Sequence, residues 1–415
     1  MSRKSRSLSI AIAGFGLLLA AMFSGPSKAE EKNNSKVSEQ LLRRMIGQMV
    51  LVGFSGDSLK DEGYKNVLKQ AENGEITGVI YLKRNIKNER TVQSLNNHLQ
   101  AVVRDPLLIS IDQEGGRIQR LTNAIGFKNT PSAAKVASTM NEAAAYEVYS
   151  ELAGDLAALG FNLNFGPVVD LNINPANPII GSIGRSYSAD PQEVIKYATA
   201  FVQAHRVNKV LTALKHFPGH GSSIGDSHKG SADVTKTWNE AELDPYKALI
   251  AMGDVDMIMS SHVINRKLSK GAVPSSLSRA TLTTVLRGNL HFEGVVISDD
   301  MQMDAIASTR SFEDSVRQAV LAGNDILVFA NDKHPDPLIP EKIAKLLVKE
   351  ANENDNMLSR IKESYFRIVA LKKKIAVAAV DTVKTKSIDS KKSEMIVTSA
   401  MLESMSRHSA LTLNE

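Results

Sequence analysis

The stretch VLTALKHFPGHG, residues 210–221, changes from apolar to polar within a few positions. Its first part, Val210–His216, is a short apolar run of the kind that forms a buried parallel strand. Lys215 and His216 end this run, and a glycine-containing segment follows. Polar residues at the end of such a strand lie at the edge where α/β proteins bind ligands. The stretch therefore predicts a strand that leads into a functional loop.

Further apolar runs of this kind are separated by longer stretches with helical periodicity. Besides Val210–His216, the predicted strands are Met49–Phe54, Thr77–Leu82, Leu107–Asp112, Phe161–Asp170, Asp256–His262, Gly294–Asp299 and Asp325–Phe329. Eight strands that alternate with helices predict an α/β fold, a (β/α)8 TIM barrel, rather than an open doubly wound sheet. No Gly-x-Gly-x-x-Gly turn follows the first run, which disfavours a dinucleotide-binding fold.

Polar residues gather where the predicted strands end, as they do around the active site of such a barrel. They are Asp112, Asp170, Lys215, His216, His262 and Asp299.

The N-terminus has the features of an export signal. Basic residues precede the apolar run Leu8–Phe23, and small residues at Ser27 and Ala29 follow with signal-peptidase spacing. Residues 1–29 are therefore predicted to be a signal peptide, and the protein to be exported to the periplasm or secreted. The run is short for a membrane span, so no stable membrane insertion is expected after cleavage. An uncleaved anchor is the alternative.

Composition excludes several classes of function. The formal net charge of +5 falls to +1 without residues 1–29, which hold four basic residues and no acid. A nearly neutral chain with 5% aromatic residues offers no nucleic-acid-binding surface. The absence of cysteine excludes disulfides and thiolate metal sites. With 43% hydrophobic residues, the chain is not wholly disordered.

The loop after Lys215 contains the pair Asp226 and His228, two residues apart. A carboxylate that accepts one imidazole N–H orients the ring and favours its protonated form. Such a pair is prepared for general acid/base catalysis near neutral pH. A solvated loop with incidental histidines is the alternative, but three histidines, a lysine and an aspartate within fourteen residues disfavour it.

A metal hydrolase is a further alternative, because His216, His220, His228 and His262 could converge on one ion. However, the chain has no tight ligand spacing such as HExxH.

Two more regions supply candidate residues. Asp299 is predicted to be the first residue beyond the seventh strand, where it can act as nucleophile or electrostatic stabiliser. Asp300 would instead cap the next helix. Residues 111–120, with Asp112 and Arg120, suit hydrogen bonding to a polyhydroxylated ligand or form a salt-bridged turn. Arg185 lies in another loop, either in the site or solvated at the surface.

Four motifs together resemble glycoside hydrolase family 3, specifically its β-N-acetylglucosaminidase group that recycles peptidoglycan. They are IDQEGGRIQRL (111–121), GSIGRSY (181–187), KHFPGHGSSIGDSH (215–228) and VISDDMQM (296–303). The resemblance covers about residues 40–375, and residues 30–375 are expected to form the family's N-terminal (β/α)8 catalytic domain. Residues 376–415 form a polar linker and a short C-terminal tail, whose last part resembles the entry to a second domain in longer relatives.

The resemblance implies roles for matching residues. Asp299 would be the nucleophile, and His228 the acid/base assisted by Asp226. The implied mechanism is retaining, through a covalent glycosyl-enzyme, and needs no metal or other cofactor. The residues implied to hold the terminal N-acetylglucosamine are Asp112, Arg120, Arg185, Lys215 and His216.

The expected function is that of an exo-acting β-N-acetylhexosaminidase. It would release non-reducing terminal N-acetylglucosamine from muropeptides, other peptidoglycan fragments or related glycans, and a monomer is expected. Alternatives are a family 3 β-glucosidase or β-xylosidase, or a catalytically weak peptidoglycan-binding protein. The glucosidase alternative is disfavoured because those relatives take their acid from a different region. Phosphorolysis instead of hydrolysis is also compatible with a histidine acid/base.

Overall fold

The computed structural model describes residues 37–227 and 230–375. The chain divides into a short unit, Met1–Ser38, and a second unit, Glu39–Glu415, which contains the barrel. The predicted signal peptide (residues 1–29) and the predicted tail (residues 376–415) lie outside the described residues. In the described part of the chain, no helix combines the length and apolarity that a membrane crossing requires.

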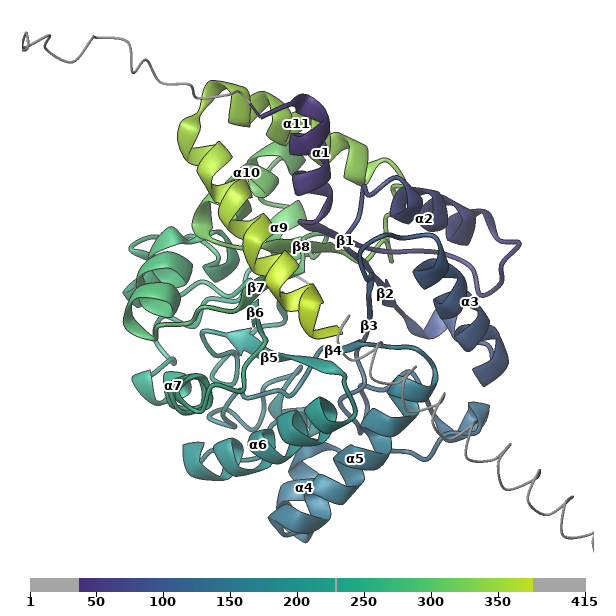
Figure 1. The fold of residues 1–415 in the computed structure, drawn as a ribbon. Coiled ribbons are helices and arrows are strands. Elements are labelled where there is room, and N and C mark those ends of the chain that lie inside the picture. The colour runs from purple at the N-terminus through teal and green to yellow at the C-terminus, as the bar shows by residue number, and fades with distance from the viewer. Residues whose placement is uncertain (1–36, 228–229, 376–415) are drawn as a thin grey trace, which may run out of the picture. The chain divides into compact units, whose positions relative to one another are not determined.

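Eight parallel strands close into a barrel in sequence order, with the first strand paired to the last (Figure 1). This confirms the predicted (β/α)8 TIM barrel. The strands are β1 (Val50–Gly53), β2 (Gly78–Tyr81), β3 (Leu108–Ile111), β4 (Leu163–Asn164), β5 (Leu211–Phe217), β6 (Met257–Ser260), β7 (Val295–Asp300) and β8 (Ile326–Phe329).

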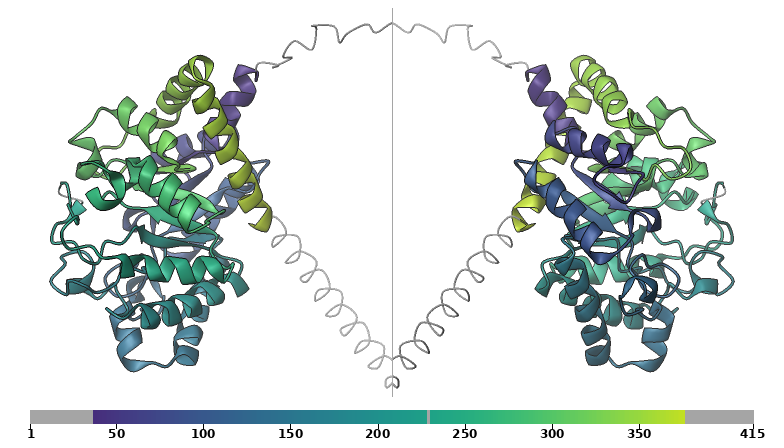
Figure 2. Two further views of the ribbon diagram at one scale, coloured as in Figure 1. Left: turned by 90° about the vertical axis from the view of Figure 1, so that its left-hand side faces the viewer. Right: turned by 90° about the vertical axis from the view of Figure 1, so that its right-hand side faces the viewer.

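Helices surround the strands (Figure 1). They are α1 (Glu39–Gly47), α2 (Glu62–Glu72), α3 (Glu89–Ala101), α4 (Ala133–Thr139), α5 (Glu142–Ala158), α6 (Pro191–Val207), α7 (Asp244–Ala251), α8 (Arg266–Ser269), α9 (Asp304–Ala307), α10 (Phe312–Ala322) and α11 (Ile339–Glu353). A π-helix, Ala280–Asn289, connects β6 to β7 after α8. A final helix over residues 355–375 lies beside α1 (Figures 1 and 2).

The fourth strand is much shorter than the predicted Phe161–Asp170. Pro167 has no backbone N–H, so the ladder of hydrogen bonds cannot continue through it. Beyond it the pairing resumes only as a single bridge between Val168 and Lys215. The apolar run was therefore correctly placed in the barrel, but proline ends its regular strand early.

The seventh strand is shifted by one residue from the predicted Gly294–Asp299 and ends at Asp300, so the prediction that Asp299 is the first residue beyond it is wrong. β7 continues through Asp300 because Met301 N donates to Val328 O at 2.9 Å, which keeps the chain paired to β8. The register of β7 against β8 shifts between Ile297 and Asp300. Asp299 is therefore held by a strand rather than by a loop.

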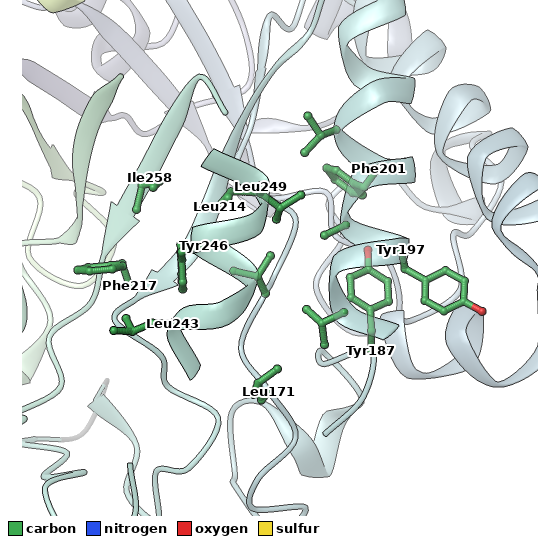
Figure 3. Packing of buried hydrophobic residues seen from close by; sticks show 14 of the residues in the cluster. Leu171, Tyr187, Tyr197, Phe201, Leu214, Phe217, Leu243, Tyr246, Leu249 and Ile258 are labelled. Atoms are coloured by element: carbon green, nitrogen blue, oxygen red, sulfur yellow. The ribbon is translucent and has the colours of Figure 1, made fainter. Parts of the chain in front are cut away.

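Part of the core lies between the strands and the helices α6 and α7 (Figure 3). Phe217, the last residue of β5, packs edge-on against Tyr246 of α7, with ring centroids 5.1 Å apart. Leu243 and Leu249 pack in the same cluster. This packing fixes the end of β5, from which the predicted functional loop departs.

Lys372, in the final helix, is buried with its Nζ 2.8 Å from Gln48 Oε1. Burial lowers the pKa of Lys372 to about 7, whereas the pKa of a lysine in the unfolded chain is about 10.4. The unfolded state therefore binds more protons between these pH values, so this residue makes stability rise with pH there. The native chain should therefore gain about 2 kcal/mol of unfolding free energy between pH 7 and pH 9 from this residue, and Lys372→Met should lack that gain.

Urea unfolding of both proteins at the two pH values measures this difference. Lys373→Met is the matched control, because Lys373 is the exposed neighbour of Lys372. Parallel pH dependences for Lys372→Met and the native chain would contradict the prediction.

Candidate active site

A cavity of about 290 Å³ lies at the carboxyl ends of the strands. Among its lining residues are six of the eight predicted site residues, Asp112, Arg120, Arg185, Lys215, His216 and Asp299. A larger cavity of about 650 Å³ is lined by residues of α10 and of the loop after β8, and none of the predicted residues borders it. The smaller cavity is therefore the candidate active site.

Lys215 is the centre of a buried charge cluster in this cavity. Its Nζ lies 2.9 Å from Asp112 Oδ1 and 2.6 Å from Glu114 Oε1. Arg120 Nη2 donates to the other oxygen of Asp112 at 3.1 Å. Burial opposes the charge of Lys215, but the two carboxylates outweigh this effect and raise its pKa. The cluster therefore presents fixed charges to the cavity, and each is compensated by a partner.

Glu114 joins this cluster to Arg185. The guanidinium donates from Nε to Oε2 at 2.8 Å and from Nη2 to Oε1 at 2.7 Å, a bidentate pair. Burial would raise the pKa of Glu114, but Arg185 and Lys215 hold it at about 2. Glu114 stays ionised and fixes the orientation of Arg185. Sequence analysis did not single out Glu114, although it lies in the motif that contains Asp112.

Asp170, in the segment that follows β4, orients His216. Its Oδ2 accepts from His216 Nδ1 at 2.6 Å, and its Oδ1 accepts from the backbone N–H groups of His216 and His220 at 3.2 and 2.8 Å. Burial opposes the charge of Asp170, but His216 outweighs it and lowers the pKa of Asp170. His216 Nε2 lies 3.3 Å from Arg185 Nη2, so Asp170 aims the ring at the charge cluster.

The two aspartates at the end of β7 have different environments. Asp300 Oδ1 accepts from Ala330 N at 3.0 Å and from Gln302 N at 3.1 Å, so Asp300 holds the backbone of two loops together. Asp299 Oδ1 accepts from Asp300 N at 2.8 Å. Both aspartates border the cavity, but Asp300 Oδ1 is engaged with the backbone of two loops, which makes Asp299 the better candidate to act on a ligand.

The predicted acid/base pair is only partly described. Asp226 is half-buried, whereas His228 lies outside the described residues, so their pairing stays a prediction. Ser227, between them, borders the cavity, and its Oγ lies 3.2 Å from His220 Nε2. The described chain therefore reaches the cavity at Ser227, directly after Asp226.

The other histidines of the proposed metal cluster have partners of their own. His262 Nδ1 lies 2.7 Å from Ser276 Oγ, and its Nε2 lies 2.9 Å from Asp300 O. Burial lowers the pKa of His220 to about 4. Within residues 37–227 and 230–375, no three side chains of the usual ligand types are grouped to hold a metal ion.

The fold and the cavity define the class of protein: a TIM-barrel enzyme whose polar site lies at the carboxyl ends of its strands. Residues 41–371 match the glycosyl hydrolase family 3 N-terminal domain, so the chain belongs to this family and is by homology a glycoside hydrolase.

Relatives and solved structures agree with this membership. The chain is 36% identical to a β-hexosaminidase of Tolumonas auensis over 62% of this chain and 76% of the relative. It is 32% identical, with a TM-score of 0.74, to a family 3 β-N-acetylglucosaminidase from Paenibacillus sp., over 81% of this chain but only 63% of that one. A β-N-acetylhexosaminidase from Beutenbergia cavernae is 26% identical with a TM-score of 0.73, over 82% of this chain and 99% of that one.

Proposed function

We propose that this chain is an exo-acting, retaining enzyme that releases non-reducing terminal N-acetylglucosamine from peptidoglycan fragments or related glycans in the periplasm or outside the cell. Homology supports its assignment as a family 3 β-N-acetylhexosaminidase. One observation carries the proposal. Asp299 borders the same cavity as the charge cluster formed by Asp112, Lys215, Glu114 and Arg185.

The charge cluster would bind the sugar. Carboxylate oxygens of Asp112 can accept from sugar hydroxyls, while Lys215, Arg120 and Arg185 can donate to hydroxyl and carbonyl oxygens. Because these side chains are already oriented by one another, little ordering entropy is lost when a ligand binds. The same rigidity places the anomeric carbon reproducibly relative to Asp299.

The chemistry would take two steps. Asp299 attacks the anomeric carbon, the glycosidic C–O bond breaks, and protonated His228 gives its proton to the leaving oxygen. Water then attacks the glycosyl ester, and neutral His228 accepts a proton from it, which regenerates Asp299 with retained configuration. Asp226 would orient the imidazole. Retaining enzymes usually use two carboxyl groups about 5 Å apart, and here the His–Asp pair would replace one of them.

Hydrolysis of chromogenic glycosides by the purified chain tests the proposal. We expect kcat/KM for a β-N-acetylglucosaminide to exceed that for the matching β-glucoside and β-xyloside by about 100-fold or more, since a site built for an amide leaves its polar groups unpaired without one. Chelator should leave the rate unchanged.

Other outcomes would identify the alternatives. A preference for glucoside or xyloside would indicate the other family 3 activities, and binding without turnover would indicate a binding protein. Loss of activity with chelator would contradict the metal-free mechanism. Formation of a sugar 1-phosphate in phosphate buffer would indicate phosphorolysis.

A further inference from the structure

Glu242 is a buried carboxyl group outside the charge cluster. It lies in the short 3-10 helix η5 (Glu240–Leu243), between β5 and α7, and is 1% exposed. Neither of its carboxyl oxygens has a hydrogen-bond partner among the described residues. Burying an ionised carboxylate without a partner is costly. Stabilisation of the fold therefore does not explain why a glutamate is buried here, and a functional role does.

The carboxyl group of Glu242 lies against the turn that begins the predicted functional loop. Gly219 in this turn has a φ of +119°, and a Cβ there would lie 2.7 Å from both Cβ and Oε2 of Glu242. Only glycine fits such a position. Trp238, just before η5, donates from Nε1 to Pro218 O at 3.0 Å. The segment that contains Trp238 and Glu242 therefore supports the turn.

The active site contacts the same turn through other residues. Asp170 Oδ1 accepts from His220 N at 2.8 Å, and Asn177 Nδ2 donates to His220 O at 2.8 Å. The chain then continues from His220 to Ser227, which borders the cavity. The turn 218–223 is thus held by Asp170, which orients His216, and by Glu242, which has no described contact with the cavity.

The charges around Glu242 favour its uncharged form. Burial, together with the charge of Asp170, raises the pKa of Glu242 to about 7, although the Ser222 hydroxyl and the backbone N–H groups of Ser222 and Asn239 oppose the shift. Ser222 Oγ is buried and, like the carboxyl oxygens of Glu242, makes no hydrogen bond to another described residue. Tyr246 also interacts with Glu242, and burial raises the pKa of this tyrosine. Ionised Glu242 would thus add a second negative charge near Asp170.

We propose that Glu242 is a positioning residue: its uncharged carboxyl supports the turn 218–223 and so fixes where Ser227 lies at the cavity and where its neighbour Asp226 lies. Ionisation of Glu242 would disturb the turn, because the buried charge must gain water or move away from Asp170. This inference rests on the proposed function, in which Asp226 belongs to the acid/base pair. It predicts that activity falls as Glu242 loses its proton.

The pH profile of Glu242→Gln tests the inference. Glutamine has nearly the same shape and stays neutral, so at pH 5.5 its kcat/KM on the chromogenic β-N-acetylglucosaminide should lie within about twofold of the native value. At pH 8, where about a tenth of a group with pKa 7 remains protonated, the variant should be faster than the native chain by about fivefold to tenfold. Glu240→Gln is the matched control, because Glu240 is exposed in the same helix.

Glu242→Asp is the second variant. It keeps a titratable carboxyl but withdraws it from Gly219 by one methylene, so kcat should fall about tenfold or more at every pH through misplacement of the loop, while the alkaline decline remains. A constant ratio of Glu242→Gln to native activity across pH, or native kcat in Glu242→Asp, would overturn the inference. Failure of the proposed function is distinct, because the native chain itself would then not hydrolyse the substrate.

Discussion

Asp299→Asn should lower kcat/KM on a chromogenic β-N-acetylglucosaminide by about 10⁴-fold or more, the size of loss seen when a nucleophile is removed. An amide cannot form the glycosyl ester that the two-step mechanism requires. The substitution preserves the shape of the side chain and an oxygen that can accept from Asp300 N, which lies 2.8 Å from Oδ1. Binding of N-acetylglucosamine, measured by calorimetry, should therefore survive the loss of turnover.

Asp300→Asn is the matched control for Asp299→Asn. Asp300 is the next residue in β7, and an asparagine oxygen can still accept from the backbone N–H groups of Ala330 and Gln302. We expect its loss of kcat/KM to be smaller than that of Asp299→Asn by at least about 100-fold. Comparable losses in the two variants, or more than about 1% residual activity in Asp299→Asn, would contradict the assignment of the nucleophile.

The barrel was predictable from sequence because each strand is buried on both faces, which makes it an apolar run. Most predicted strand ends lie within one or two residues of the observed ones. The exception is β4, whose early end arises from hydrogen bonding rather than from hydrophobicity, because Pro167 lacks an N–H. Pairing with β8 moves the end of β7 by a single residue, to Asp300.

The sequence predicted which residues lie in the site, but not which of them form ion pairs with one another. The carboxyl ends of the strands meet at one edge of a barrel, so residues such as Asp112 and Lys215 were expected to lie together. By contrast, Glu114 and Arg185 are 71 positions apart, and their bidentate pairing depends on how two loops fold. Glu242 gives no signal in sequence, since its properties come from burial and from the missing partner.

The second large effect is expected at the opposite end of the barrel, where Asp325 precedes β8. Its carboxylate is fully buried and accepts from three arginines, Arg287 at 2.6 Å, Arg360 at 3.2 Å and Arg367 at 3.3 Å. It also accepts from Val296 N at 2.9 Å. These contacts join β7, β8, the π-helix and the final helix. Burial lowers the pKa of Arg287 to about 10 even though Asp325 opposes that shift.

Asp325→Asn should therefore destabilise the chain by about 3–5 kcal/mol, because it leaves three half-buried guanidinium groups without their buried counter-charge. Urea unfolding at pH 7 measures the loss. Asp314→Asn is the control, because Asp314 pairs with Arg317 at the surface and should cost less than about 1 kcal/mol. A loss below about 1 kcal/mol in Asp325→Asn would show that the cluster is not needed for stability. Because Asp325 lies at the amino end of its strand, away from the candidate active site, kcat of the folded variant should stay close to the native value.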